Sequence, residues 1–165
     1  MRRDSVFRTV VITISDRGAR GERIDKSGPA VEDLLREKGF EIVGRQIIPD
    51  EKYLIRETLL KWCDITDLIV TTGGTGVGPR DVTPDATREI IDREILGMAE
   101  AMRYHSMSIT PHAMISRAVV GILKHTLIIN LPGSPKGATE NLSVLFPALD
   151  HAIEKIKGDP SECAL

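Results

Sequence analysis

The glycine-rich segment 71–87, TTGGTGVGPRDVTPDAT, constrains the fold of this chain more than any other feature. It follows the apolar residues 68–70, which are typical of a short buried strand. Four glycines then fall within six residues, and Pro84 and Asp85 supply the residues typical of a first helical turn. The segment therefore predicts a strand, a tight loop and a helix in succession, with Thr83 as the helix N-cap.

A glycine-rich loop in this position is suited to an anionic ligand. Glycines let the backbone turn sharply and bring bare N–H groups against a phosphate. The segment is neither a P-loop nor a G-x-G-x-x-G motif, and the alternative is a structural turn that binds nothing. Asp81 favours a ligand, because a carboxylate beside an anion needs a cation between them. Mg²⁺, held by one or two carboxylates and by phosphate oxygens, meets that need.

Length and composition indicate one ordinary globular domain over residues 1–165. Hydrophobic residues make up 41% of the chain, and the net charge of −2 favours neither nucleic acid nor a membrane surface as a partner. Cys63 and Cys163 fit no zinc motif and are not expected to pair; Cys63 is expected to be a core thiol. No signal peptide or long apolar run is present, so we expect a cytoplasmic protein.

Strand and helix patterns alternate along the chain. Strands are predicted over residues 6–14, 40–48, 68–71 and 126–131, and helices over 30–38, 51–63, 84–93 and 97–106, with a C-terminal helical stretch from about 138 to 156. Pro147 should kink or split that last stretch. The alternation predicts a three-layer α/β/α sandwich with a mainly parallel central sheet.

Polar loops follow four of the predicted strands and should converge on one edge of the sheet, where such sheets bind ligands. Three of these loops carry carboxylates, at Asp16, Asp50 and Asp81, and the fourth carries Ser134 at a predicted helix start. The alternative for Asp16 and Asp50 is loop capping. Covalent catalysis is not expected, because Ser116 has no obvious base nearby in sequence and the four histidines are scattered.

Several segments together resemble the molybdopterin adenylyltransferase family, which includes MogA, MoaB and the G domains of gephyrin-like proteins. The matching stretches are SDRGARGERIDKSGP, IIPDE, TTGGTGVGPRDVTPDAT, MISRAVVGI and LIINLPGSPKGATENL. They run from about residue 11 to 157, and the combination of GGTG-x-G-x-RDVTP with NLPGSPK is highly specific. The resemblance implies the MogA/MoaB-like molybdopterin-binding fold.

The resemblance also implies a reaction, in which molybdopterin attacks the α-phosphate of ATP with Mg²⁺ present, giving adenylyl-molybdopterin and pyrophosphate. Asp50 and Asp81 resemble the catalytic and metal-binding acidic pair. The implied nucleotide-binding residues are Thr72, Gly73, Gly74, Thr75 and Gly76, and the implied pterin-binding residues are Ser15, Asp16, Ser27, Gly28, Ser116, Arg117, Pro132, Gly133 and Ser134.

Family members assemble as homotrimers and hand their product to a molybdenum insertase of the MoeA type, so the resemblance implies both for this chain. The sequence after GGTG follows the MogA pattern at residues 79–87, which favours an active adenylyltransferase. Two alternatives stay open: a non-catalytic MoaB-like pterin-binding or scaffold protein, and a phosphate-binding domain unrelated to molybdenum. Asp81 argues against the first, and NLPGSPK argues against the second.

Overall fold

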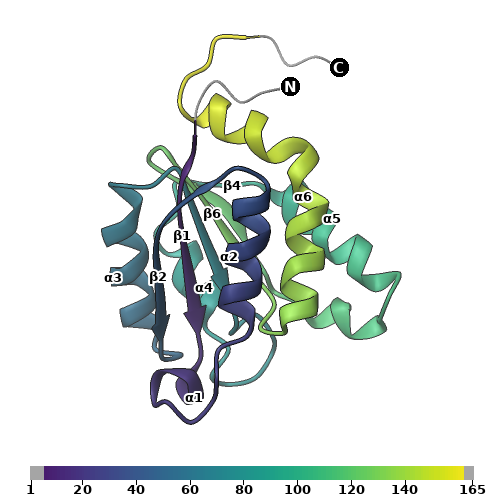
Figure 1. Ribbon diagram of the computed structural model, residues 1–165. Coiled ribbons are helices and arrows are strands. Elements are labelled where there is room, and N and C mark those ends of the chain that lie inside the picture. The colour runs from purple at the N-terminus through teal and green to yellow at the C-terminus, as the bar shows by residue number, and fades with distance from the viewer. Residues whose placement is uncertain (1–5, 162–165) are drawn as a thin grey trace.

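The six strands of the protein form one twisted sheet in the order β2-β1-β3-β6-β5-β4 (Figure 1). The computed structural model describes residues 6–161. The strands are β1 (Arg8–Ile14), β2 (Glu41–Ile48), β3 (Leu68–Thr72), β4 (Arg93–Glu94), β5 (Val120–Leu123) and β6 (Thr126–Leu131). The neighbours β2, β1, β3 and β6 are parallel, and only β5 and β4 join by antiparallel pairing. The prediction of a mainly parallel sheet is confirmed.

Helices cover both faces of the sheet (Figure 1). One face carries α2 (Ser27–Glu37), α5 (Leu96–Met107) and α6 (Pro135–Ile156), and the other carries α3 (Lys52–Cys63) and α4 (Thr83–Arg88). Alternate residues of each strand point to opposite faces, so Val11 packs beneath the first set and Val10 beneath the second. Because β1 and β3 are covered on both faces, their sequences are almost continuously apolar. The three-layer prediction is confirmed.

The topology fixes where a ligand site can form. From β1 the chain passes to β2 on one side and later to β3 on the other, so the strand order reverses between β1 and β3. A crevice opens at such a switch point, outside the carboxyl ends of the strands. The loops after β1, β2, β3 and β6 lie along this edge, as the sequence predicted.

Several predicted boundaries were wrong, and several short elements were not predicted. The loop after β1 contains a short helix, α1 (Asp16–Ala19), and α2 begins at Ser27 rather than at residue 30. The earlier start has a local cause, because the carboxylate of Asp25, which precedes the N-cap Lys26, accepts a hydrogen bond from the N–H of Gly28 at 3.0 Å and so satisfies a donor of the first turn. Helix α4 ends at Arg88, and β4, β5 and the 3₁₀ helix η1 (Pro111–Ile115) were not predicted.

Thr83 is not the N-cap of α4, contrary to the prediction. Val82 precedes the helix with no capping side chain, and Thr83 is its first residue. The buried Thr83 hydroxyl instead donates to the carbonyl oxygen of Gly73 at 2.9 Å. The hydroxyl thus ties the start of α4 to the start of the glycine-rich loop, a tertiary contact that local sequence rules do not anticipate.

Helix α6 runs through Pro147 without interruption, but its axis changes direction towards its yellow, C-terminal end (Figure 1). The prediction of a kink or a break is therefore met by a kink. Cys63 is buried, as expected, and Cys163 lies outside the described residues. No helix within residues 6–161 is long and apolar enough to cross a membrane.

Candidate active site

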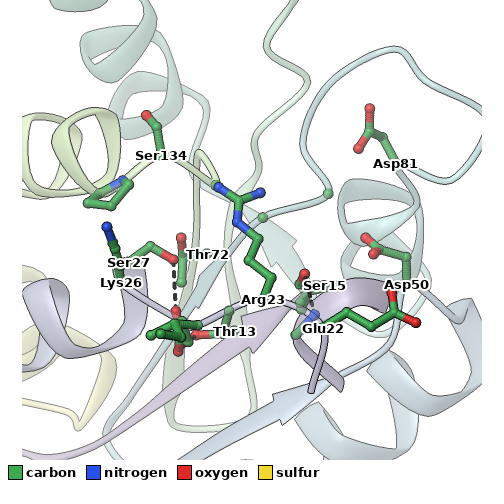
Figure 2. Close-up of a pocket in the computed structure, with 18 residues that line it drawn as sticks. Thr13, Ser15, Glu22, Arg23, Lys26, Ser27, Asp50, Thr72, Asp81 and Ser134 are labelled. Carbon is green, nitrogen blue, oxygen red and sulfur yellow. Dashed lines mark hydrogen bonds between the residues drawn. The ribbon is translucent and has the colours of Figure 1, made fainter. Parts of the chain in front are cut away.

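A polar cleft of about 750 Å³ lies at the carboxyl ends of β1 and β3 (Figure 2). Its walls come from the loops after β1, β2, β3 and β6, which are far apart in the sequence. Nine residues predicted from the sequence line it: Ser15, Ser27, Asp50, Thr72, Gly73, Gly74, Asp81, Gly133 and Ser134. The structure therefore brings both members of the predicted acidic pair to one cavity.

A second, smaller cavity of about 260 Å³ holds most of the remaining predicted residues. Thr75, Gly76, Ser116 and Pro132 line it, and Ser134 lines both cavities. The glycine-rich loop therefore contributes Gly73 and Gly74 to the large cleft and its next two residues to the small cavity. The sequence analysis assigned residues 72–76 of this loop to nucleotide binding alone. Which ligand each cavity binds stays a prediction.

The glycine-rich loop has a conformation that requires glycine. Gly73 has φ +107° and Gly74 has φ +66°, both in the left-handed region. The N–H of Gly73 donates to the carbonyl of Leu131 at 3.0 Å, which joins the loop to the end of β6. A Cβ on Gly74 would lie 3.0 Å from Oδ1 of Asp50. These angles fit the sharp backbone turn that is expected of the glycines in this loop.

The next three N–H groups of this loop lack a hydrogen-bond partner among the described residues. Among residues 6–161, no hydrogen bond uses the N–H of Gly74, Thr75 or Gly76. Consecutive unpaired N–H groups beside a strand end suit phosphate oxygens. This arrangement fits the predicted phosphate cradle.

Asp16 and Asp50 bind each other's main chain. The N–H of Asp16 donates to Oδ2 of Asp50 at 2.8 Å, and the N–H of Asp50 donates to Oδ1 of Asp16 at 3.0 Å. This reciprocal pair joins the ends of β1 and β2 and confirms a capping role for both carboxylates. Asp16 itself does not line either cavity, whereas Asp50 does.

The two carboxylates differ in their electrostatics. The Arg80 guanidinium donates two hydrogen bonds of 3.0 Å to Asp16 and lowers the pKa of that carboxyl. Burial raises the pKa of Asp50, and the negative charges of Asp16 and Asp81 raise it further. Of these two carboxyl groups, Asp50 is therefore the one whose neutral form is favoured.

Asp50 and Asp81 fit a divalent cation for that reason. Two partly buried carboxylates on one cleft repel each other, and a cation between them relieves the repulsion. Within residues 6–161, no group of three or more His, Cys, Asp or Glu side chains forms a complete protein-only metal site. The expected ligand set is two carboxylates completed by phosphate oxygens, as Mg²⁺ commonly adopts.

Two cations of the cleft were missed by the sequence analysis. Arg23 and Lys26, from the loop between α1 and α2, line the cleft and are exposed (Figure 2). They bring positive charge to a loop whose Glu22 and Asp25 also line the cleft. Basic residues between two predicted ligand segments were the available signal, but only the fold shows that this loop borders the cleft.

Two of the four predicted serines, Ser15 and Ser134, are helix N-caps at the cleft. Ser15 Oγ accepts from the N–H of Gly18 at 3.0 Å, and Ser134 Oγ accepts from the N–H of Gly137 at 3.1 Å. Gly28 lies just behind the wall, where its N–H donates to Asp25. Arg117 lines neither cavity and instead contacts the inner side of the glycine-rich loop.

Comparison with known proteins shows the family. Residues 10–151 match the family described as a probable molybdopterin binding domain. Molybdopterin adenylyltransferase from Helicobacter pylori J99 is 40% identical over 153 residues, which cover 90% of this chain and 87% of that protein. The enzyme of the same name from Escherichia coli K12 is 44% identical over 146 residues, or 84% and 73% of the two chains. This chain belongs to the molybdopterin adenylyltransferase family.

A longer relative and two solved structures agree with this family assignment. Gephyrin from Dictyostelium discoideum is 42% identical over 161 residues, and the match spans 91% of this chain but only 22% of that protein. The molybdopterin biosynthesis enzyme MoaB from Thermus thermophilus has a TM-score of 0.88 at 46% identity, covering 95% of this chain and all of that one. A MogA structure has a TM-score of 0.87 at 39% identity, covering 90% and 99%. The MogA/MoaB-like fold is thus confirmed.

Proposed function

We propose that this family member transfers AMP from ATP to molybdopterin, giving adenylyl-molybdopterin and pyrophosphate. A phosphate oxygen of molybdopterin forms a bond to the α-phosphorus of ATP as the bond from that phosphorus to the pyrophosphate oxygen breaks. The observation that carries the proposal is the cleft itself, where Gly74, whose N–H is unpaired, lines the wall together with the carboxylates of Asp50 and Asp81. The cations Arg23 and Lys26 line the same cleft, as do Glu22 and Asp25. Relatives at 40% and 44% identity are named for this transfer.

Different residues of the site have different proposed roles in binding the substrates and the metal. The N–H groups after Gly73 bind phosphate oxygens of ATP, and Arg23 and Lys26 neutralise the remaining phosphate charge. Asp50 and Asp81 would hold Mg²⁺, which would stabilise the charge that develops on phosphate oxygens. The capped start of α6 at Ser134 attracts an anionic group of the pterin substrate. Positioning two anions in line is the main contribution of such a site.

The non-catalytic alternative is a MoaB-like pterin-binding scaffold. The chain resembles structures bearing both names, so fold likeness does not separate the two. Asp81 on the cleft wall favours catalysis, because a carboxylate there hinders anion binding unless a cation is part of the reaction.

We also propose a cytoplasmic homotrimer that passes its product to a molybdenum insertase. Five exposed apolar side chains lie on the second half of α5, on η1 and in the segment between them, in a set we term the α5–η1 patch: Tyr104, Met107, Ile109, Met114 and Ile115. A surface of this kind suits contact with another copy of the chain.

The deciding experiment incubates the protein with molybdopterin, ATP and Mg²⁺ and follows adenylyl-molybdopterin. We expect product to form with the wild type, with slow ATP hydrolysis when the pterin is absent. Asp81→Asn keeps the size of the side chain and should reduce transfer by about 10²-fold. Molybdopterin binding without any transfer by the wild type would support the scaffold alternative instead.

A further inference from the structure

Arg117 organises the inner side of the glycine-rich loop. Its main-chain N–H donates to the carbonyl of Thr75 at 2.8 Å, and its Nε donates to the carbonyl of Gly76 at 2.7 Å. Its Nη2 donates to the carbonyl of Asp81 at 2.5 Å. Three carbonyls along the loop thus accept hydrogen bonds from one residue on a distant segment of the chain.

Asp85 fixes the plane of this guanidinium. The carboxylate, in the first turn of α4, accepts from Nη1 at 3.0 Å and from Nη2 at 2.9 Å. The pairing lowers the pKa of Asp85 and raises that of Arg117, so both groups are charged at neutral pH. A bidentate guanidinium has a set orientation, which a lysine ammonium cannot reproduce.

The contacts of Arg117 extend to the position of Asp81. The carboxylate oxygen Oδ2 of Asp81 accepts a hydrogen bond from the N–H of Gly78 at 2.9 Å. The main-chain carbonyl of Asp81 accepts a hydrogen bond from Nη2 of Arg117. The turn between Gly76 and Asp81 is therefore stabilised by the Asp81 side chain within the turn and by the Arg117 guanidinium at its two ends. The direction in which Asp81 faces the cleft depends on both.

We propose that Arg117 is a positioning residue for Asp81, and not the pterin ligand that the family resemblance implies. It lines neither cavity, and its Nε, Nη1 and Nη2 atoms are all engaged by the loop and Asp85. This inference rests on the proposed function only for its kinetic consequence. The structural consequence, an ordered loop from Gly73 to Asp81, is independent of it.

Arg117→Lys tests the proposal, because it keeps the positive charge and removes the planar fork. We measure kcat for adenylyl transfer, the Kd of molybdopterin without ATP, and amide hydrogen exchange of residues 73–81. We expect kcat to fall by about 10²-fold, as for a misplaced catalytic group, while Kd stays within about twofold of wild type. Exchange at the hydrogen-bonded loop amides of Gly78 and Asp81 should become faster.

Two further variants keep the test decisive. Asp85→Asn leaves Arg117 in place but weakens its orientation, so we expect a smaller loss of kcat, of about tenfold, and again an unchanged Kd. Arg36→Lys on the surface of α2, where Arg36 pairs with Glu32, is the matched control and should leave all three readouts unchanged.

A Kd for molybdopterin weakened by about tenfold or more in Arg117→Lys, with loop exchange unchanged, would overturn the proposal and restore Arg117 as a ligand. Unchanged kcat with unchanged exchange would also overturn it. If the wild type forms no adenylyl-molybdopterin, the proposed function fails on that result alone. The exchange of residues 73–81 then still decides whether Arg117 orders the loop.

Discussion

Single residues of the cleft combine a structural and a chemical task. Asp50 joins the ends of β1 and β2 through the main chain of Asp16, and it also presents a carboxylate to the cleft. Joining the two strands needs only a hydrogen-bond acceptor. Binding a cation in the cleft needs the negative charge of Asp50, and burial disfavours that charge by raising the pKa of the carboxyl group. Removing the charge should therefore separate folding from activity.

Asp50→Asn should stabilise the protein without ligands while it impairs transfer. The folded-state pKa of Asp50 is raised, so its neutral form favours folding at low pH, and this contribution is lost as pH rises through the raised pKa. The variant keeps the neutral form at every pH. We expect its Tm to exceed that of the wild type at pH 7 by about 2–4 °C, the shift typical of 1 kcal/mol in a domain of this size.

The measurement is the thermal unfolding of both proteins at pH values from about 4 to about 8, which extend upwards from the ordinary carboxyl pKa. The difference in Tm should open as pH rises and close at the acidic end. A variant that is less stable than the wild type at neutral pH would show that the charge of Asp50 supports the fold.

Gly76 should not tolerate a Cβ, because that atom would lie 2.9 Å from Oδ2 of Asp81. The carboxylate is the far end of a flexible side chain, so Gly76→Ala should fold and displace Asp81 rather than disrupt the core. We expect transfer to fall by about 10–100-fold with little change in Tm. Gly97→Ala, where a Cβ meets nothing within 4 Å, is the control for added bulk. Wild-type rates for Gly76→Ala would mean that Asp81 has no fixed position to lose.

At the scale of elements, the start of α6 shows how a cap also borders a site. Ser134 closes the first turn of a 22-residue helix and lines both cavities. The helix N-terminus therefore meets the ligand region with its positive end. Loss of the cap should affect the helix and the ligand together.

Ser134→Ala should cost about 1 kcal/mol in the free energy of unfolding, as for other lost N-caps. It should also weaken molybdopterin binding more than ATP binding, because this turn is the predicted pterin side of the site. Denaturant unfolding and calorimetric titration measure the two effects. Ser143→Ala, in the exposed middle of the same helix, is the control, since its hydroxyl donates to the carbonyl of Thr139 within the helix. Equal losses for both ligands would refute the division of the site.

At the scale of the whole molecule, the large cleft and the α5–η1 patch use separate surfaces. No residue of the patch lines the cleft, although Ile109 and Ile115 also line the smaller cavity. Tyr104 is 79% exposed on α5, although aromatic side chains make up only 4% of the chain. An exposed aromatic residue among exposed methionine and isoleucine side chains is typical of a protein interface. The proposed trimer contact is therefore on the helical layer and borders the smaller cavity, but none of its residues lines the large cleft.

Tyr104→Lys should weaken self-association, with an apparent dissociation constant raised by about 30-fold if Tyr104 is a central contact. Sedimentation velocity over a range of concentrations measures the change. Tyr53→Lys on α3 makes the same substitution at a side chain that is 67% exposed, and it should leave assembly unchanged. A wild type that stays monomeric throughout the range would reject the trimer.

The sequence by itself determined the layers of the fold and the edge that carries the site. Strands β1 and β3 contain unbroken runs of three apolar residues because both faces are covered, and helical periodicity marks α2, α3, α5 and α6. These are local patterns, so one sequence displays them. Short elements such as β4 and α1 lack enough residues to show a period, and they were missed for that reason.

Only the tertiary structure decided which predicted residues share a cavity and which support it. Thr83 binds Gly73 instead of capping its own helix, and Arg117 binds Gly76, which lies 41 residues earlier in the chain. Arg23 and Lys26 become cleft residues because their loop folds over the end of β1. Hydrogen bonds of this kind join groups that are distant in sequence, and their partners are chosen by the packing of the sheet, which no local pattern encodes.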